Sequence, residues 1–252
     1  MSKQPVRIIG SYLSPYVRKV LVTLAVKGVP YEIDPIIPFF GDERFSTMSP
    51  LRRIPVLVDD RVTLSDSSVI CQYLEDRYGT PALFPADIAD RARARWLEEY
   101  ADTRIGDVFI WHLFNQVAIT PYVWGGATDP GIVKRARDEE IPDVLAYLEP
   151  QLPEAGFLFG ADISIADISL AVFFRNAAFA RYVVDAARWP RTAAWVTRVH
   201  AIDAFQSLMP FENKMIRTPI PQHRAVLAEM GAPLTSESYG TATPRRGVMP
   251  TT

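Results

Sequence analysis

Residues 6–37 decide the fold, because they predict a strand, a helix and a second strand in the sequence VRIIGSYLSPYVRKVLVTLAVKGVPYEIDPII. The β-branched start of this stretch predicts the first strand, and its last seven residues predict the second. Ser14 and Pro15 indicate a helix start, with Ser14 as N-cap and Pro15 at the first helical position. Gly28 is expected to end that helix. Its apolar stripe follows the spacing i, i+3, i+4 and i+7 and consists of Val17, Val20, Leu21 and Leu24.

The next forty residues continue this mixed pattern. A short helix is expected near residues 43–45. Two β-rich runs, 56–58 and 61–64, flank the dipeptide Asp59-Asp60, which predicts a tight hairpin. A helix over 68–78 follows. The order β-α-β-α-β-β-α predicts a small mixed sheet that needs helices to cover it.

Helical signals dominate the rest of the chain. Trp96, Leu97 and Tyr100 begin a long amphipathic helix, and Ser164 with Asp167 forms a Ser-x-x-Asp capping box at another helix start. The end of the chain is rich in Pro, Ser, Thr and Gly, so we expect a tail that is loose or draped on the surface and dispensable for ligand binding. The predicted divisions are an α/β domain at 1–80, a linker at 81–90, an all-α domain at 91–217 and the tail at 218–252.

Composition excludes several classes of protein. Hydrophobic residues make up 48% of the chain and the formal net charge is -2, so we expect a folded, soluble protein with no nucleic-acid partner. No apolar run approaches the roughly 20 residues of a membrane-spanning helix. The first five residues lack the apolar core of a secretory signal, and the single cysteine, Cys71, rules out an intramolecular disulfide. The three histidines show no metal-ligand spacing. We therefore predict a cytoplasmic protein without membrane contact and without a metal.

Several motifs resemble those of serine-type glutathione S-transferases. Residues 12–20 resemble the turn that activates the nucleophile, residues 49–57 the segment that ends in a cis-proline, and residues 64–70 the acidic-Ser pair that holds the γ-glutamyl end of glutathione. Residues 160–167 resemble the capping box of the family's helical domain. The resemblance, which spans about residues 6–210, implies a thioredoxin-like N-terminal domain followed by an α-helical bundle domain, with glutathione as cosubstrate.

The resemblance also assigns the site. Ser14 would be the catalytic residue, because a thiolate beside a helix start is stabilised by backbone N–H groups, by the helix dipole and by the Ser14 hydroxyl. The remaining glutathione-binding residues would be Arg53, Ile54, Pro55, Asp66 and Ser67, with a cis peptide between Ile54 and Pro55. An apolar acceptor pocket would be lined by Tyr16, Phe39, Phe40, Trp111, Phe114 and Tyr122.

Three functions remain open from the sequence. The first is a glutathione transferase, of the kind used in detoxification, that adds the glutathione thiolate to an apolar electrophile. The second is a glutathione-dependent isomerase like the zeta-class relatives, whose Ser-x-x-Ser signature is matched here by Ser11 and Ser14. The third is a non-catalytic binding or assembly module that kept the fold. For all three the resemblance implies a homodimer.

Overall fold

The computed structural model describes residues 4–247. The chain divides into two compact units, unit 1 with Met1–Pro81 and Ser207–Thr252, and unit 2 with Ala82–Gln206. Residues 1–3 of the predicted first domain and 248–252 of the predicted tail lie outside the described residues. Unit 1 therefore contains residues 207–247, which we call the C-terminal segment.

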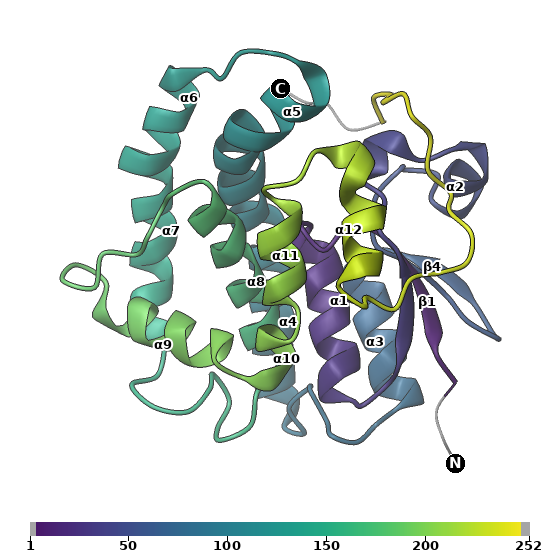
Figure 1. Ribbon diagram of the computed structural model, residues 1–252. Helices are drawn as coiled ribbons and strands as arrows, with labels where there is room; N and C mark the ends of the chain where they lie inside the picture. The colour runs from purple at the N-terminus through teal and green to yellow at the C-terminus, as the bar shows by residue number, and fades with distance from the viewer. Residues whose placement is uncertain (1–3, 248–252) are drawn as a thin grey trace. The chain divides into compact units, whose positions relative to one another are not determined.

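Unit 1 is built on a four-stranded sheet with the strand order β2-β1-β3-β4 (Figure 1). β1 is parallel to β2 and antiparallel to β3, and β3 is antiparallel to β4. This arrangement confirms the predicted thioredoxin-like domain. Its elements are β1 (Val6–Ile9), α1 (Pro15–Val26), β2 (Tyr31–Asp34), η1 (Pro38–Phe40), α2 (Glu43–Met48), β3 (Val56–Val58), β4 (Thr63–Ser65) and α3 (Ser67–Arg77).

Helix α1 forms as its sequence predicts. Ser14 is the N-cap, its side chain accepts from the backbone N–H of Val17, and a proline occupies the first turn. The stripe predicted from the spacing is fully buried. α1 packs beside α3, as Figure 1 shows, so the two helices cover the sheet together. The apolar face of α1 therefore fixes where Ser14 stands relative to the sheet.

The C-terminal segment is draped on unit 1, which is one of the two arrangements expected for the tail, and it is not loose. It forms α11 (Met209–Met215), η5 (Ile220–Gln222) and α12 (His223–Glu229), and Leu234 then pairs in parallel with Ile33 of β2. The N–H of Ile33 donates to the carbonyl of Pro233 over 2.7 Å, and the N–H of Thr235 donates to the carbonyl of Ile33 over 3.1 Å. An edge strand leaves such groups unpaired, and here the chain's own end satisfies them.

Unit 2 is helical, which confirms the predicted all-α domain. Its first helix begins at Ile88, inside the predicted linker, and its last ends at Gln206, so residues 207–217 of the predicted helical domain belong to unit 1 instead. The elements are α4 (Ile88–Tyr100), η2 (Ala101–Ile119), α5 (Thr120–Trp124), α6 (Pro130–Arg135), η3 (Ala136–Glu140), α7 (Ile141–Leu148), η4 (Glu149–Gln151), α8 (Ile165–Phe179), α9 (Pro190–His200) and α10 (Asp203–Gln206). η2 and η3 are π-helical, with i→i+5 bonds.

The predicted capping box anchors α8. The Ser164 backbone N–H donates to the Asp167 carboxylate over 3.0 Å, and the Ser164 hydroxyl donates to the same oxygen over 2.6 Å. The indole N–H of Trp195 reaches the other carboxylate oxygen over 2.9 Å and so ties α9 to the start of α8. Although burial raises the pKa of the Asp167 carboxyl, these donors offset part of that effect.

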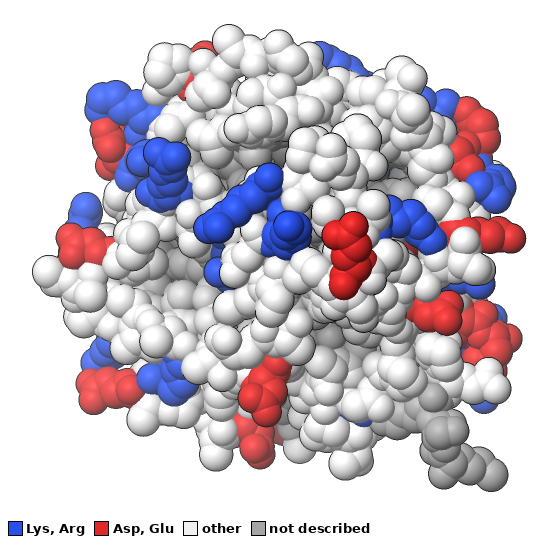
Figure 2. Space-filling view, in the orientation of Figure 1, with Lys and Arg blue, Asp and Glu red and all other residues white. Residues whose placement is uncertain are grey.

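The helices and the surface charges of the described residues bear on membrane contact and on charged partners. Among residues 4–247, none of the helices has the length and apolarity that crossing a membrane requires. On the face drawn in Figure 2, acidic and basic side chains are interspersed, both at the edges and across the middle.

Candidate functional site

Three segments meet at one end of the sheet of unit 1. Ile9 at the end of β1 and Ser65 at the end of β4 both pair with Val56 at the start of β3. The loop after β1, the residues before β3 and the residues after β4 therefore lie at the same end of the sheet. These segments carry the residues predicted from the sequence, which we call the candidate site: Ser14, Ile54, Pro55, Asp66 and Ser67.

Ser14 is the least buried of the three hydroxyl-bearing residues in the turn after β1. Its oxygen accepts from the Val17 N–H at 3.4 Å, which leaves the hydroxyl hydrogen able to donate to a neighbouring group. Ser11 is buried, and its side-chain oxygen accepts from the Leu13 N–H at 3.2 Å. Tyr12 is buried as well, and its hydroxyl lies 3.2 Å from that of Tyr31. Burial raises the pKa of the Tyr12 phenol. Neither Ser11 nor Tyr12 therefore offers an accessible, readily ionised group in place of Ser14.

A buried ion pair contacts the turn that ends at Ser14. Arg18 of α1 pairs with Glu212 of α11, and both side chains are almost completely buried. The Arg18 guanidinium also donates to the Tyr12 carbonyl over 3.3 Å, within the turn that ends at Ser14. Our sequence reasoning missed this pair. The available signal was that Arg18 precedes Leu21 by three positions and so lies on the buried side of the helix.

The segment before β3 contains a buried residue, Ile54, whose peptide groups could pair with a ligand. The Ile54–Pro55 bond is cis, as the resemblance implies. Among the described residues, no hydrogen bond of the Ile54 N–H or C=O is recorded. The backbone of Arg53 is held on both sides by the Ser49 hydroxyl, at 3.0 Å and 2.8 Å, while the Arg53 side chain is exposed. Arg53 is thus fixed at its backbone and able to move at its guanidinium.

Asp66 has the strained backbone of the site. Its φ of 87° and ψ of 123° are unusual for a residue with a side chain. One carboxylate oxygen accepts from the N–H groups of Ser68 and Val69 at 3.0 Å and 3.2 Å, so Asp66 caps α3. Ser67, the first residue of that helix, is buried. Strain of this kind costs about 1–3 kcal/mol and tends to occur at functional sites.

Lys19 links the two helix starts. It lies on α1 and is fully buried, and its ammonium donates to the Ser68 hydroxyl at the start of α3 over 2.8 Å. The contact holds the helix that presents Ser14 against the helix that presents Asp66. Lys19 was likewise missed from the sequence, where nothing distinguishes it from a surface lysine.

The predicted acceptor residues divide between the units. In unit 1, Tyr16 is partly exposed on α1, Phe39 is buried, and Phe40 lines a cavity beside the C-terminal segment. In unit 2, Trp111 is partly exposed and Phe114 is buried, while Tyr122 is 78% exposed. A pocket formed by all six remains a prediction.

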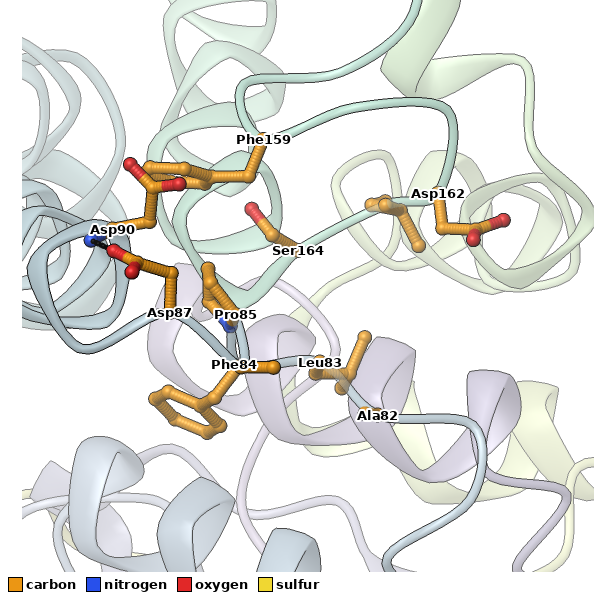
Figure 3. Close-up of a pocket in the computed structure, with 11 residues that line it drawn as sticks. Ala82, Leu83, Phe84, Pro85, Asp87, Asp90, Phe159, Asp162 and Ser164 are labelled. Carbon is orange, nitrogen blue, oxygen red and sulfur yellow. Dashed lines mark hydrogen bonds between the residues drawn. The ribbon is translucent and has the colours of Figure 1, made fainter.

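Unit 2 contains a cavity of its own. Figure 3 shows its lining residues, which come from the chain before α4 and the chain before α8. The cavity has a volume of about 250 Å³. Asp87, Asp90 and Asp162 contribute carboxylates to its lining. Asp87 caps α4 by accepting from the N–H groups of Ala89 and Asp90. None of the predicted site residues lines this cavity, and no group of three potential metal ligands was found among residues 4–247.

Comparisons with known proteins point to one family. Family models described as glutathione S-transferase, N-terminal domain, and glutathione S-transferase, C-terminal domain, match residues 8–82 and 130–198. Glutathione S-transferase U17 of Arabidopsis thaliana is 26% identical over 85% of this chain and 94% of its own. A crystal structure of a glutathione S-transferase from Rhodospirillum rubrum F11 is 28% identical, covers 81% of this chain and 91% of that one, and has a TM-score of 0.75.

A further solved structure carries a ligand. It is a glutathione S-transferase from Methylobacterium radiotolerans in complex with glutathione sulfonate. That protein is 27% identical to this chain, covers 81% of this chain and 94% of its own, and has a TM-score of 0.67.

Proposed function

The chain belongs to the glutathione S-transferase family, and from this premise we propose that it binds glutathione at the candidate site and activates its thiol for attack on an apolar electrophile. The observation that carries the proposal is the convergence of the Ser14 turn, the Ile54–Pro55 peptide and Asp66 at one end of the sheet. A solved relative with a glutathione derivative bound supports the choice of cosubstrate.

Each residue has a chemical role in this proposal. The Ser14 hydroxyl donates a hydrogen bond to the glutathione sulfur, and the N-terminus of α1 adds its positive end. A free thiol is only a few per cent ionised at neutral pH. Lowering its pKa by about two units, or roughly 2.7 kcal/mol, makes most of it thiolate. Ser14 itself forms no covalent bond.

The other residues bind the ends of glutathione. The peptide N–H and C=O of Ile54 pair with the peptide-like backbone of the ligand. Asp66 accepts from its α-amino group, and Ser67 donates to its α-carboxylate at the start of α3. The exposed guanidinium of Arg53 reaches the glycyl carboxylate. These contacts are the same in ground and transition states, so they contribute to binding rather than to the rate of the bound chemistry.

The structure bears on both alternatives. The isomerase hypothesis requires Ser11 together with Ser14. Ser11 is buried, and its side-chain oxygen accepts a hydrogen bond from the Leu13 N–H. This observation favours a one-serine transferase over the isomerase. A non-catalytic module needs neither an accessible Ser14 hydroxyl nor a strained Asp66. We retain it as the alternative that the following experiment excludes.

Ser14→Ala tests the proposal. Removing one charge-assisted hydrogen bond, worth roughly 1.5–3 kcal/mol, should raise the pKa of bound glutathione by about one to two units. Conjugation at neutral pH should fall by about one to two orders of magnitude, with little change in glutathione affinity. The measurement is the thiolate absorbance of bound glutathione against pH. Ser11→Ala is the matched control, since it removes the neighbouring buried hydroxyl. Equal titration of wild type and Ser14→Ala would refute the role of Ser14.

Two further parts of the proposal concern the setting. We place the protein in the reduced cytoplasm, where a cysteine outside any disulfide, such as the buried Cys71, is the usual state. We also propose a homodimer, because Leu51 and Val69 of unit 1 are about half exposed although both are apolar. Sedimentation at micromolar concentration should show the dimer, and a monomer alone would contradict it.

A further inference from the structure

The C-terminal segment reaches the turn of the candidate site through α11. Figure 1 shows α11 next to α1, and two neighbouring residues of α11 act on Tyr12, which precedes Ser14 by two positions. The Phe211 ring lies 5.0 Å from the Tyr12 ring, measured between centroids, at an interplanar angle of 33°. Glu212 pairs with Arg18, whose guanidinium donates to the Tyr12 carbonyl. Both contacts therefore converge on one residue of the turn that presents Ser14.

The peptide between Tyr12 and Leu13 is held at both ends. Its carbonyl accepts from the Arg18 guanidinium over 3.3 Å, and its N–H donates to the Ser11 side-chain oxygen over 3.2 Å. Because a peptide unit is planar and rigid, hydrogen bonds at both ends fix its orientation. The Ser14 N–H also donates to the Ser11 carbonyl over 3.0 Å. Arg18 therefore sets the orientation of the peptide plane that leads into Ser14.

Glu212 fixes the guanidinium that makes this bond. The Arg18 Nε donates to the Glu212 carboxylate, while Nη2 of the same group donates to the Tyr12 carbonyl. A guanidinium is a planar fork, so placing one nitrogen on a carboxylate sets the direction of the others. The Arg18 and Glu212 side chains are 0% and 1% exposed, so water does not compete for these bonds. Moving the Glu212 carboxylate would therefore move Nη2 relative to the carbonyl.

α11 has a support of its own, which is remote from the Ser14 turn. The Nε2 of His223 in α12 lies 3.1 Å and 2.9 Å from the carbonyl oxygens of Met215 and Thr218, at and just after the end of α11. α12 is held at β2 in turn, where the Arg224 guanidinium contacts the Asp34 carboxylate over 3.2 Å. The support of α11 therefore comes from the edge of the sheet and not from the candidate site.

We propose that Glu212 is a positioning residue for the proposed activation of glutathione: it holds Arg18 on the Tyr12 carbonyl and so orients the Ser14 hydroxyl toward the glutathione sulfur. This inference rests on the proposed function. Glu212 is buried, so it acts through Arg18 and not on the ligand. Because a hydrogen bond weakens steeply as its angle departs from linearity, a small rotation of the turn reduces the stabilisation of the thiolate. Glu212 should therefore affect the ionisation of bound glutathione more than its affinity.

Glu212→Asp and Glu212→Gln separate position from charge. The first keeps the charge but withdraws the carboxylate by one methylene, and the second keeps the length and an acceptor oxygen but removes the charge. The measurement is thiolate absorbance of bound glutathione against pH. Bound glutathione in Glu212→Asp should titrate about one pH unit higher than in wild type, and kcat at neutral pH should fall by up to about tenfold. The glutathione KM should stay within about twofold, and Glu212→Gln should match wild type.

Two further variants guard against a trivial loss of stability. Arg18→Lys breaks the same link from the other side, because a single ammonium replaces the fork, and it should also raise the titration should Glu212→Asp fold poorly. Glu75→Ala is the matched control, since it removes the carboxylate 2.7 Å from the buried ammonium of Lys27, at the opposite end of α1. It should destabilise the protein and titrate like wild type. An equal shift in Glu75→Ala would mean that general loosening of α1 suffices, and would overturn the proposal.

Ser14→Ala is the reference for the remaining outcomes. In that background Glu212→Asp should raise the titration no further, because the hydroxyl through which Glu212 acts is gone. A further rise in the double variant, or a shift in Glu212→Gln at least as large as in Glu212→Asp, would show that the charge acts on its own and would overturn the proposal. A shift in Ser14→Ala with none in Glu212→Asp or Arg18→Lys would overturn this inference alone. No shift in Ser14→Ala would overturn the role of Ser14 and this inference with it.

Discussion

Asp34 and Asp66 are carboxylates at the same end of one sheet, yet their surroundings differ. Asp34 ends β2, pairs in register with Ile9 and is fully buried. It accepts from the backbone N–H of Tyr239 over 2.7 Å and from the guanidinium of Arg224 over 3.2 Å, both in the C-terminal segment. Asp66 follows β4 at the opposite edge, is exposed and has a φ of 87°. One carboxylate is enclosed by the chain's own end, and the other is left open.

The two carboxylates differ in burial and in their hydrogen-bond partners. Burial raises the pKa of the Asp34 carboxyl, although its donors from Tyr239, Ser238 and Arg224 act in the opposite direction. The Asp34 carboxylate holds the C-terminal segment against β2 through these hydrogen bonds. Asp66 combines exposure with backbone strain, which is the combination expected where a ligand completes the hydrogen bonding. We propose that Asp66 binds glutathione whereas Asp34 holds the C-terminal segment, so variants of these two residues should respond differently.

Glu212→Ala should produce the largest effect, because Glu212 is the buried charge of the C-terminal segment that pairs with Arg18. Removing Glu212 leaves the buried Arg18 guanidinium without its carboxylate counter-charge, and breaking a buried ion pair in this way typically costs about 3–5 kcal/mol. Chemical denaturation should report this loss in the free energy of unfolding. Glu237→Ala is the control. The Glu237 side chain is exposed, and its carboxylate lies 4.0 Å from the Arg44 guanidinium, too far for a hydrogen bond. This variant should leave the unfolding midpoint unchanged. Equal effects of the two variants would show that burial of the pair is irrelevant.

Asp66→Asn should weaken glutathione binding while leaving the fold intact. Asparagine keeps the oxygen that caps α3 and tolerates a positive φ, so stability should change little. Loss of a charged hydrogen bond, roughly 1.5–3 kcal/mol, should raise the glutathione KM about tenfold or more. Turnover at saturating glutathione should be nearly unchanged, since the contact is remote from the sulfur. A collapse of kcat at unchanged KM would contradict the assignment of Asp66 as a binding residue.

The helix starts of the molecule were predictable from the sequence because their signals are local. Ser14 with Pro15 predicts the start of α1, and Asp66 with Ser67 predicts the start of α3. The capping box of Ser164 and Asp167 was equally visible. Each of these features depends on residues within a few positions of one another. Periodicity and capping rules describe that range well.

The contacts of the C-terminal segment with β2 and α1 were not predictable from local patterns. The residues after Thr218 are rich in Pro, Ser, Thr and Gly, which indicated a tail that is either loose or draped on the surface. Their order comes instead from backbone bonds to β2, such as that between Ile33 and Pro233, which leave no trace in composition. The pair of Arg18 and Glu212 spans 194 positions. A contact at that separation cannot be inferred from spacing in a single sequence.

Asp34→Ala should affect stability rather than glutathione binding. The variant leaves the Tyr239 N–H and part of the Arg224 guanidinium without their acceptor, which costs roughly 1–3 kcal/mol. Denaturation should show this loss, and the glutathione KM should match wild type. Together with Asp66→Asn, this gives opposite responses from the two edges. A raised KM in Asp34→Ala would mean that the C-terminal segment takes part in the site.

Arg245→Ala should have the smallest effect, although its side chain also joins the C-terminal segment to the N-terminal part of unit 1. The guanidinium pairs with Glu43 and donates to the Ser46 hydroxyl over 2.9 Å, but these side chains lie at the surface. Exposed ion pairs gain little because water solvates both charges and salt screens them. The bond from the Arg245 N–H to the Phe39 carbonyl, 2.8 Å long, survives the substitution. We therefore expect an unfolding midpoint indistinguishable from wild type at physiological salt, by the same denaturation assay. A loss as large as that of Asp34→Ala would show that surface charge, rather than buried and backbone hydrogen bonds, holds this segment against β2.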